Sequence, residues 1–342
     1  MLSALIRRRA GLLLLGGVLL AVVLALAVVA FGGGGADVVV YNGRSQYGDE
    51  AALTAFEDET GKSLELRGGT APELFERLRS EGSETPADLL VTTDLANLWR
   101  AKEAGLLEPV STPALERQVP SQWRDPDNEW WGLSLRVRTP MRSTSVPEDA
   151  VRSYEDLGDT RWKGKLCLRT SNNEYNQSLV ADMLAKRGPE ETRALLESWM
   201  ENDPRILGSD VDVLEAIASE RCMVGLTNHY YLARELEEDP DFPVAPAWPD
   251  RDAAGAHTNL SGVGLVKGSE HRADAIRLME FLTAREAQEA IVENGEFAAN
   301  PDVPPAEHLR EWADVKTDPI DVQQAGPALE QAVALMQRVG WR

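Results

Sequence analysis

Four of the six tyrosines in this chain lie where an apolar run that reads as a strand is followed by the start of a predicted helix. These four are Tyr47, Tyr175, Tyr230 and Tyr231, and they follow apolar runs at 38–42, 165–170 and 222–227. The other two, Tyr41 and Tyr154, are expected in the hydrophobic core. Loops at the carboxyl ends of strands are the positions from which an α/β protein builds its ligand sites. We therefore expect the four phenols to meet at the mouth of one cleft, and the adjacent pair to face solvent.

Converging phenols favour a narrow class of ligand. Tyrosine ionises near pH ~10, so several phenolates at neutral pH require a strong cause. A hard trivalent cation such as Fe³⁺ supplies it, because metal binding deprotonates the ligands, and the positive end of a helix also favours phenolate. Softer metals would require cysteine or clustered histidine, and Ca²⁺ or Mg²⁺ would require carboxylates. The tyrosines therefore predict a ferric site, with aromatic packing or carbohydrate stacking as the alternative.

Nearby arginines could balance the charge of such a site, because four phenolates outweigh the charge of one Fe³⁺ ion. The candidates are Arg44, Arg136 and Arg138. The alternative is that these arginines make ordinary surface ion pairs. His229 precedes the tyrosine pair, and we expect it to be a helix-end residue rather than a base.

The two cysteines lie at equal distances from two of the tyrosines. Cys167 precedes Tyr175 by eight residues, and Cys222 precedes Tyr230 by eight residues. An even number of cysteines favours a disulfide in an exported protein, and two buried thiols are the alternative. If the two strands are neighbours in register, a bridge between them would brace the floor beneath the tyrosines.

The N-terminal segment predicts export. Three arginines at 7–9 precede an apolar run at 10–31 and four glycines at 32–35, a pattern that directs the following chain outward across a membrane. The run is close to the length of a bilayer span, so cleavage after Ala30 and an uncleaved anchor both remain open. We therefore expect the body from Ala36 onward to be extracytoplasmic, either periplasmic or at the cell surface. The formal net charge of −21 argues against nucleic acid as a partner.

The remaining sequence predicts an α/β fold with two lobes. From Asp37, strands alternate with amphipathic helices in a βαβαβα series, which right-handed crossovers fold into a doubly wound lobe. A second series begins near 165, crossings near 135 and 261 form a hinge, and one helix is expected at 273–295. We expect a signal peptide or anchor with its tether at 1–35, lobe 1 at 37–135 and 262–300, lobe 2 at 136–261, and a helical segment packed on the lobes at 301–342.

Several segments resemble signature stretches of the ferric-ion-binding proteins that serve iron(III) ABC importers. They are YNGRSQYGDEAA (41–52), TPADLLVTTDLANLWRAKEAGLLEPV (85–110), SYEDLGDTRWKGKLCLRTS (153–171), NEYNQSLVA (173–181), NHYYLAR (228–234) and AHTNLSGVGLVKG (256–268). The resemblance covers essentially the whole extracytoplasmic chain, in order. It implies a type II periplasmic-binding-protein fold in which tyrosines from both lobes hold Fe³⁺, and a monomer that delivers the ion to an inner-membrane ABC permease.

The resemblance also implies a ligand set and two departures from the family pattern. The ligands carried over by position are Tyr47, Tyr175, Tyr230 and Tyr231. Many relatives have histidine where this chain has Gln46, so water or an anion such as carbonate could complete the coordination instead. Relatives also tend to have a tyrosine where this chain has Phe297, which offers no phenol.

Two other function classes are alternatives to a ferric receptor. A solute-binding protein of the same fold could take an organic cation, such as a polyamine or a thiamine-like molecule, or a phosphorylated small molecule. Its cleft would use carboxylates, aromatic side chains and main-chain amides. An enzyme is not expected, because the sequence has no glycine-rich phosphate loop, no histidine-rich metal spacing and no G-x-S-x-G elbow.

Overall fold

The structure is a computed structural model that describes residues 36–44, 50–249 and 255–342. The predicted signal peptide or anchor at 1–35 and the predicted site residues Gln46 and Tyr47 lie outside the described residues. Within the described ranges, no helix is both long enough and apolar enough to cross a membrane. The elements below all belong to Val38–Arg342, which forms one compact unit.

The first elements form the parallel series that the sequence predicts. Strand β1 pairs with β2 on one side and with β3 on the other, both in parallel. Polar caps fix where two helices begin: Thr70 and Glu73 form a capping box at α3, and the Asp94 side chain accepts from Asn97 N at α4. The elements are β1 (Val38–Asn42), α2 (Glu50–Thr60), β2 (Leu64–Gly68), α3 (Ala71–Glu81), β3 (Leu89–Thr92) and α4 (Leu95–Glu103).

A second parallel series follows further along the chain. Strand β6 pairs in parallel with β7 on one side and with β8 on the other. Asn173 caps α6, because its side chain accepts from the backbone N–H groups of Tyr175 and Asn176. The elements are β6 (Leu166–Arg169), α6 (Glu174–Arg187), α7 (Pro189–Glu201), β7 (Arg205–Leu207), α8 (Asp210–Ala218), β8 (Val224–Asn228) and α9 (His229–Glu238).

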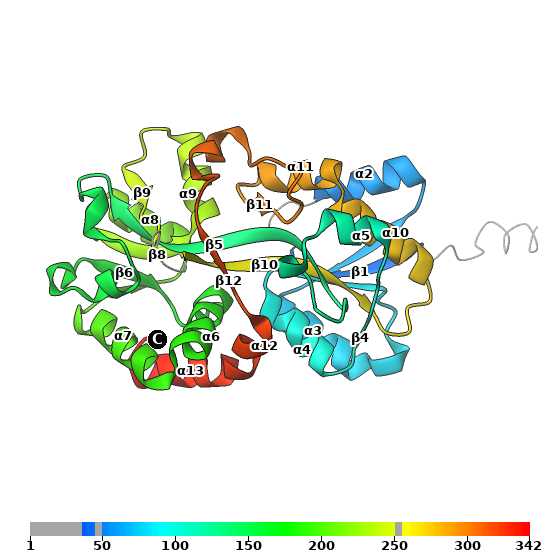
Figure 1. The fold of residues 1–342 in the computed structure, drawn as a ribbon, viewed down its shortest axis with the longest axis horizontal. Coiled ribbons are helices and arrows are strands. Elements are labelled where there is room, and N and C mark those ends of the chain that lie inside the picture. The colour runs from blue at the N-terminus through cyan, green and yellow to red at the C-terminus, as the bar shows by residue number, and fades with distance from the viewer. Residues whose placement is uncertain (1–35, 45–49, 250–254) are drawn as a thin grey trace, which may run out of the picture. The chain divides into compact units, whose positions relative to one another are not determined.

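Two long strands join these series (Figure 1). β5 (Trp131–Ser143) and β10 (Ala256–Val266) run antiparallel to each other, and the strand order is β2-β1-β3-β10-β5-β8-β6-β7. Their register shifts between Ser261 and Gly262, where a Cβ on Gly262 would lie 2.6 Å from Trp131 O, so only glycine fits there. The sheet is therefore mixed rather than mainly parallel at its centre. The division into two lobes stays a prediction.

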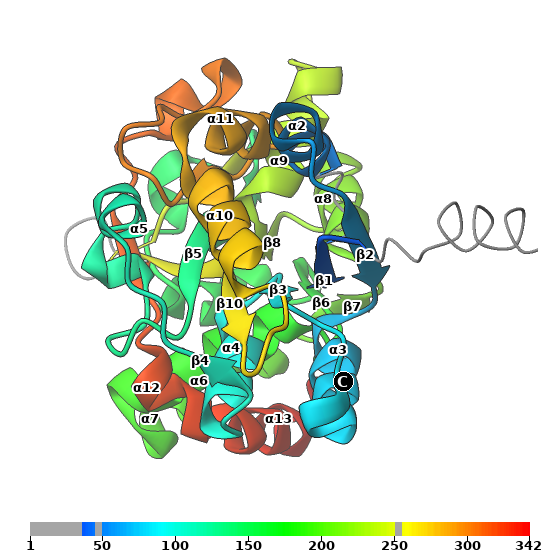
Figure 2. The same ribbon diagram turned by 90° about the vertical axis from the view of Figure 1, so that its right-hand side faces the viewer.

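Helices cover both faces of the strands. α2, α10 and α11 lie on one side of β1–β3, and α3 and α4 lie on the other (Figures 1 and 2). The single helix expected at 273–295 is wrong, because Ala284 adopts an extended conformation and separates two helices. The remaining elements are β4 (Leu107–Glu108), α5 (Pro113–Gln118), β9 (Val244–Pro246), α10 (Arg272–Thr283), α11 (Arg285–Glu293), β11 (Phe297–Ala298), β12 (Thr317–Pro319), α12 (Val322–Ala325) and α13 (Leu329–Arg338), with seven short 3₁₀ turns among the described residues.

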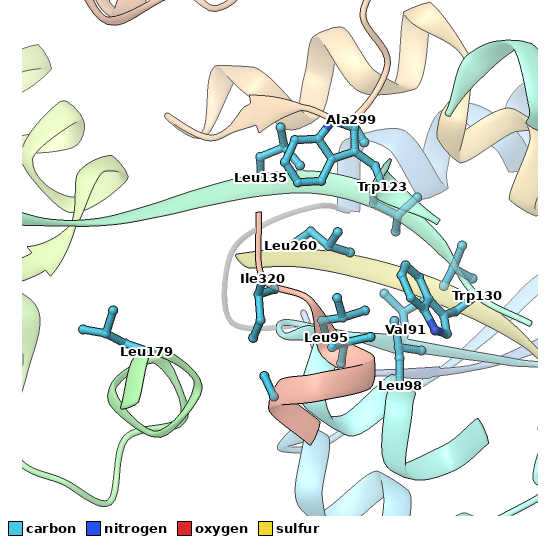
Figure 3. Close-up of a cluster of buried hydrophobic side chains, with 14 of the residues drawn as sticks. Val91, Leu95, Leu98, Trp123, Trp130, Leu135, Leu179, Leu260, Ala299 and Ile320 are labelled. Atoms are coloured by element: carbon cyan, nitrogen blue, oxygen red, sulfur yellow. The ribbon is translucent and has the colours of Figure 1, made fainter. Parts of the chain in front are cut away.

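The hydrophobic core is continuous through the middle of the sheet. Val91 of β3, Leu98 of α4 and Leu135 of β5 belong to one buried cluster, which also reaches Leu260 of β10 and Leu179 of α6 (Figure 3). Burying one such leucine side chain contributes roughly 1.5–3 kcal/mol. β1, β6 and β8 contribute to this cluster, whereas Leu232 and Ala233 of α9 belong to a second buried cluster that also contains both cysteines.

The predicted disulfide is confirmed. β6 and β8 are neighbours in register, with Leu166 opposite Val224, and the Sγ atoms of Cys167 and Cys222 are 2.01 Å apart. Both cysteines are fully buried, and the bridge closes a loop of 55 residues. It joins the strand that leads to Tyr175 to the segment that leads to Tyr230.

Removing this bridge should lower the free energy of unfolding. We expect a Cys167→Ala/Cys222→Ala variant to lose about 2–4 kcal/mol, because the unfolded chain regains the freedom that the loop closure removes. Urea unfolding with and without reductant measures the loss. Reductant should shift the wild-type midpoint and leave the double variant unchanged; an unshifted wild-type midpoint contradicts the prediction.

Candidate metal centre

Three of the four predicted tyrosine ligands lie at the starts of two helices. Tyr175 is the second residue of α6, and Tyr230 and Tyr231 are the second and third residues of α9. The ring centroids of Tyr230 and Tyr231 are 4.3 Å apart. Both helices turn their positive N-terminal ends toward the tyrosines, an arrangement that favours negative charge there.

The side chain of Arg136 connects the tyrosines of the two helices. Its guanidinium carbon lies 5.9 Å from the Tyr175 ring centroid and 6.0 Å from the Tyr230 ring centroid, within the range of a cation–π interaction. The structure therefore places Tyr175 and Tyr230 on either side of one arginine from β5, with Tyr231 against the ring of Tyr230.

The tyrosines are more enclosed than the sequence suggests. Tyr230 is 0% exposed and Tyr175 is 3% exposed, while Tyr231 is half-buried. The expectation that the adjacent pair faces solvent is therefore wrong for Tyr230, because α9 starts directly at the end of the buried strand β8. Tyr41 and Tyr154 are buried in the core, as expected.

Arg44 and Arg136 share one buried carboxylate, that of Glu296. Arg136 Nε donates to Glu296 Oε1 at 2.8 Å, and Arg44 donates to Glu296 Oε2 at 3.1 Å. Ser134 Oγ also donates to Glu296. Burial raises the pKa of Glu296, but Arg136 and Arg44 lower it more strongly, so its net pKa is about 2. The carboxylate is thus ionised at neutral pH and bound to both arginines.

Arg138 belongs to a second buried network, around Asp210. Arg138 Nη1 donates to Asp210 Oδ1 at 2.9 Å, and Arg169 Nη1 donates to Asp210 Oδ2 at 2.6 Å. Arg138 also donates to the side chains of Asn176 and Asn228. All three predicted arginines are buried, so the alternative of surface ion pairs is wrong.

Asn228 links this second network to the tyrosine pair. Its Oδ1 accepts from Arg138, and its Nδ2 donates to the Tyr230 hydroxyl oxygen at 3.4 Å. The phenol oxygen is therefore oriented by an amide that Arg138 holds in place.

His229 is enclosed and electrically neutral. It is fully buried, and burial lowers the pKa of its imidazole to about 3. Val137 N donates to its Nδ1 at 3.1 Å, and its ring stacks on Phe297 with centroids 4.5 Å apart. These contacts agree with a packing role at the helix end rather than with a general base.

Sequence reasoning missed two acidic residues near the starts of α4 and α6. Asp94 and Glu174 line a pocket of about 300 Å³, together with Arg100 and several residues of the segment 326–333. Asp94 is fully buried, and burial, with a smaller contribution from Glu174, raises its pKa to about 6. Its position at the end of the run 87–94 was the available signal, because strand ends are where sites form.

Asp94 should destabilise the fold at neutral pH. Its folded pKa lies above its unfolded value of 3.8, so the folded state holds the proton more tightly. The penalty is absent below about pH 3.8, develops as the pH rises, and is complete above about pH 6. We expect Asp94→Asn, which retains the helix cap, to be more stable than wild type at pH 7.5 by on the order of 2 kcal/mol.

Urea unfolding at pH 7.5 and at pH 4 tests this expectation. The advantage of Asp94→Asn should shrink toward zero at pH 4. Asp125→Asn is a matched control that should lose stability at pH 7.5, because the fully buried Asp125 is paired with Lys102 at 2.8 Å. A loss of stability in Asp94→Asn at pH 7.5 contradicts the assigned pKa.

Comparison with known proteins gives one consistent group of relatives. The chain is 37% identical over 315 residues to iron uptake protein A1 of Synechocystis sp., covering 90% of this chain and 88% of that protein. A solved structure of the Trichodesmium protein IdiA (FutA), in complex with iron and citrate, has a TM-score of 0.83 at 35% identity and covers 89% of this chain and 99% of its own. The ferric binding protein from Campylobacter jejuni has a TM-score of 0.82 at 29% identity, with 89% and 100% covered.

The agreement extends to the family level. The model of the bacterial extracellular solute-binding protein family matches residues 84–318, a range that includes β5, β6 and β8 and the tyrosines of α6 and α9. The chain belongs to the family of bacterial extracellular solute-binding proteins and has their mixed α/β, type II periplasmic-binding-protein fold.

Proposed function

We propose that this protein is an extracytoplasmic Fe³⁺ receptor that delivers ferric iron to an ABC importer. The observation that carries the proposal is that Tyr175 and Tyr230 lie beside Arg136 at two helix starts, with Tyr231 packed on Tyr230. The printed names of the relatives, iron uptake protein and ferric binding protein, support the same ligand. The family supports transport rather than catalysis as the role of the site.

The proposed ligands are the phenolate oxygens of Tyr175, Tyr230 and Tyr231, joined by that of Tyr47. Tyr47 and Gln46 lie outside the described residues, so their part rests on the resemblance alone. We propose that carbonate or water, or else Gln46, completes the coordination. Phe297 takes no part in binding, and its ring instead stacks on His229.

The buried arginines suit such a ligand set electrostatically. Four phenolates around Fe³⁺ leave one excess negative charge. The network of Glu296 with Arg44 and Arg136 carries one excess positive charge, and the network of Asp210 with Arg138 and Arg169 carries another. Positive charge at this depth is screened little by solvent, so it can stabilise the phenolates.

We also propose where the receptor is located, which lobes enclose the iron and which protein accepts it. The N-terminal segment 1–35 would export the chain or anchor it, and the body would bind iron as a monomer in a cleft between lobes at 37–135 with 262–300 and at 136–261. The segment 301–342 would pack on both lobes; α12 contacts α4 and α6. An inner-membrane ABC permease would accept the ion.

Titration with ferric citrate tests the proposed function. We expect a visible phenolate-to-iron charge-transfer band that saturates at one Fe³⁺ per chain. Tyr230→Phe should weaken binding by more than the roughly 10–100-fold that changes in residues orienting metal ligands cost. Tyr41→Phe is the control, because the Tyr41 hydroxyl donates to Glu81 in the first strand series and should leave the band unchanged.

Two results would reject the proposal. One is wild-type protein without a band, and the other is Tyr230→Phe with unchanged binding. A thermal-shift screen then examines the alternative, since bound ligand stabilises the folded state by mass action. Stabilisation by a polyamine or by thiamine, but not by Fe³⁺, would favour an organic cation in the acidic pocket beside Asp94 and Glu174.

A further inference from the structure

A short segment after α11 is packed against the start of α9. This segment, 294–297, is called the clasp below. Arg234 Nε of α9 donates to Asn294 O at 3.0 Å, and Phe297 stacks on His229 with centroids 4.5 Å apart. The clasp therefore contacts α9 at two points, His229 and Arg234, which flank the tyrosine pair.

Gly295 brings the clasp backbone close to Tyr230 and Ala233. A Cβ at this position would lie 3.2 Å from Ala233 Cβ and 3.4 Å from Tyr230 O, and its φ of +87° disfavours other residues. The clasp thus lies next to the backbone of Tyr230, close enough that even a methyl side chain would touch it. A displacement of the clasp would therefore change the packing around Tyr230.

Glu296 belongs to the same segment, and its side chain is bound by residues outside α9. Its side chain is 1% exposed, and its two oxygens accept from Arg136, Arg44 and Ser134. A buried carboxylate of this kind is stable only while its partners remain, because an uncompensated buried charge is costly. Glu296 and Arg136 therefore fix each other's position.

Arg136 carries this restraint to the tyrosine rings. Its Nε is held by Glu296 Oε1 at 2.8 Å, and its guanidinium lies about equally far from the rings of Tyr175 and Tyr230, at 5.9 and 6.0 Å. If the guanidinium turned away from Glu296, it would also leave this position between the two rings.

We infer that Glu296 is a positioning residue of the metal site, which seats α9 through the clasp and holds Arg136 between Tyr175 and Tyr230. The inference rests on the proposed function and names a residue that no tyrosine pattern indicates. Glu296 does not touch the metal. It acts through Arg136 and through the backbone that packs on Tyr230.

Glu296→Gln tests the inference, because glutamine keeps the shape and removes the charge that binds both arginines. We expect Fe³⁺ affinity to fall at least about tenfold, the lower end of the range for residues that orient metal ligands. The charge-transfer band should also move in wavelength, since Arg136 is no longer held in a fixed position beside the phenolates. Asp125→Asn is the control for loss of a buried, paired carboxylate, and it should change neither quantity.

A double-mutant cycle separates positioning from a general effect of charge. If Glu296 acts through Arg136, adding Glu296→Gln to Arg136→Gln should change affinity and band position much less than it does in wild type. If Glu296 contributes only charge or general stability, the two effects should add. Additive effects would overturn the part of the inference in which Glu296 acts through Arg136, and hydrogen exchange tests the part in which it acts through the clasp.

Hydrogen exchange of iron-free protein gives a readout that does not depend on metal. Glu296→Gln should speed exchange of the amides at 229–233 relative to Asp125→Asn, because the clasp no longer seats α9. Wild-type protein that binds no Fe³⁺ rejects the proposed function and this inference together. Wild-type protein that binds Fe³⁺, with Glu296→Gln unchanged in affinity, band and exchange, rejects this inference alone.

Discussion

The tyrosine cluster depends on the parallel pairing of β6 with β8. Parallel strands end at the same edge of a sheet, so the helices that follow them begin side by side. Here those helices are α6 and α9, and their second residues are Tyr175 and Tyr230. The disulfide between Cys167 and Cys222 joins the same two segments of the chain eight residues before each of these tyrosines. This one strand pairing thus places Tyr175 near Tyr230 and brings the N-terminal ends of α6 and α9 together. It also brings the two cysteines close enough to form the disulfide.

The arginines show how the fold keeps positive charge at this edge in a chain with a net charge of −21. Burying a guanidinium is costly unless it is paired and hydrogen-bonded. Glu296 and Asp210 meet this requirement, each for two arginines, and the excess cation in each network remains beside the tyrosines. The overall acidity of the chain therefore says little about the local field, which is set by groups withdrawn from water.

Much of the fold and part of the site could be predicted from the sequence, and the limits have physical reasons. The strands near Val38, Leu166 and Val224, their helices and the cysteine pairing follow from local periodicity and from spacings of a few residues. Glu296 could not be found that way, because its partners Arg44 and Arg136 lie 252 and 160 residues away. The break at Ala284 was missed for a related reason. Helical periodicity continues on both sides, and tertiary contacts decide where the backbone turns.

If the tyrosines bind Fe³⁺ as proposed, their burial makes the site selective among metal ions. A phenolate removed from water is costly unless a cation or hydrogen-bond donors compensate it. Arg136 and Asn228 lie beside Tyr230, but one guanidinium and one amide do not compensate the charge of several phenolates. Only a strongly Lewis-acidic ion offsets the cost of deprotonating several phenols at once. An exposed cluster would ionise at less cost and would distinguish ions less sharply, so the enclosure of Tyr175 and Tyr230 favours Fe³⁺ over divalent competitors.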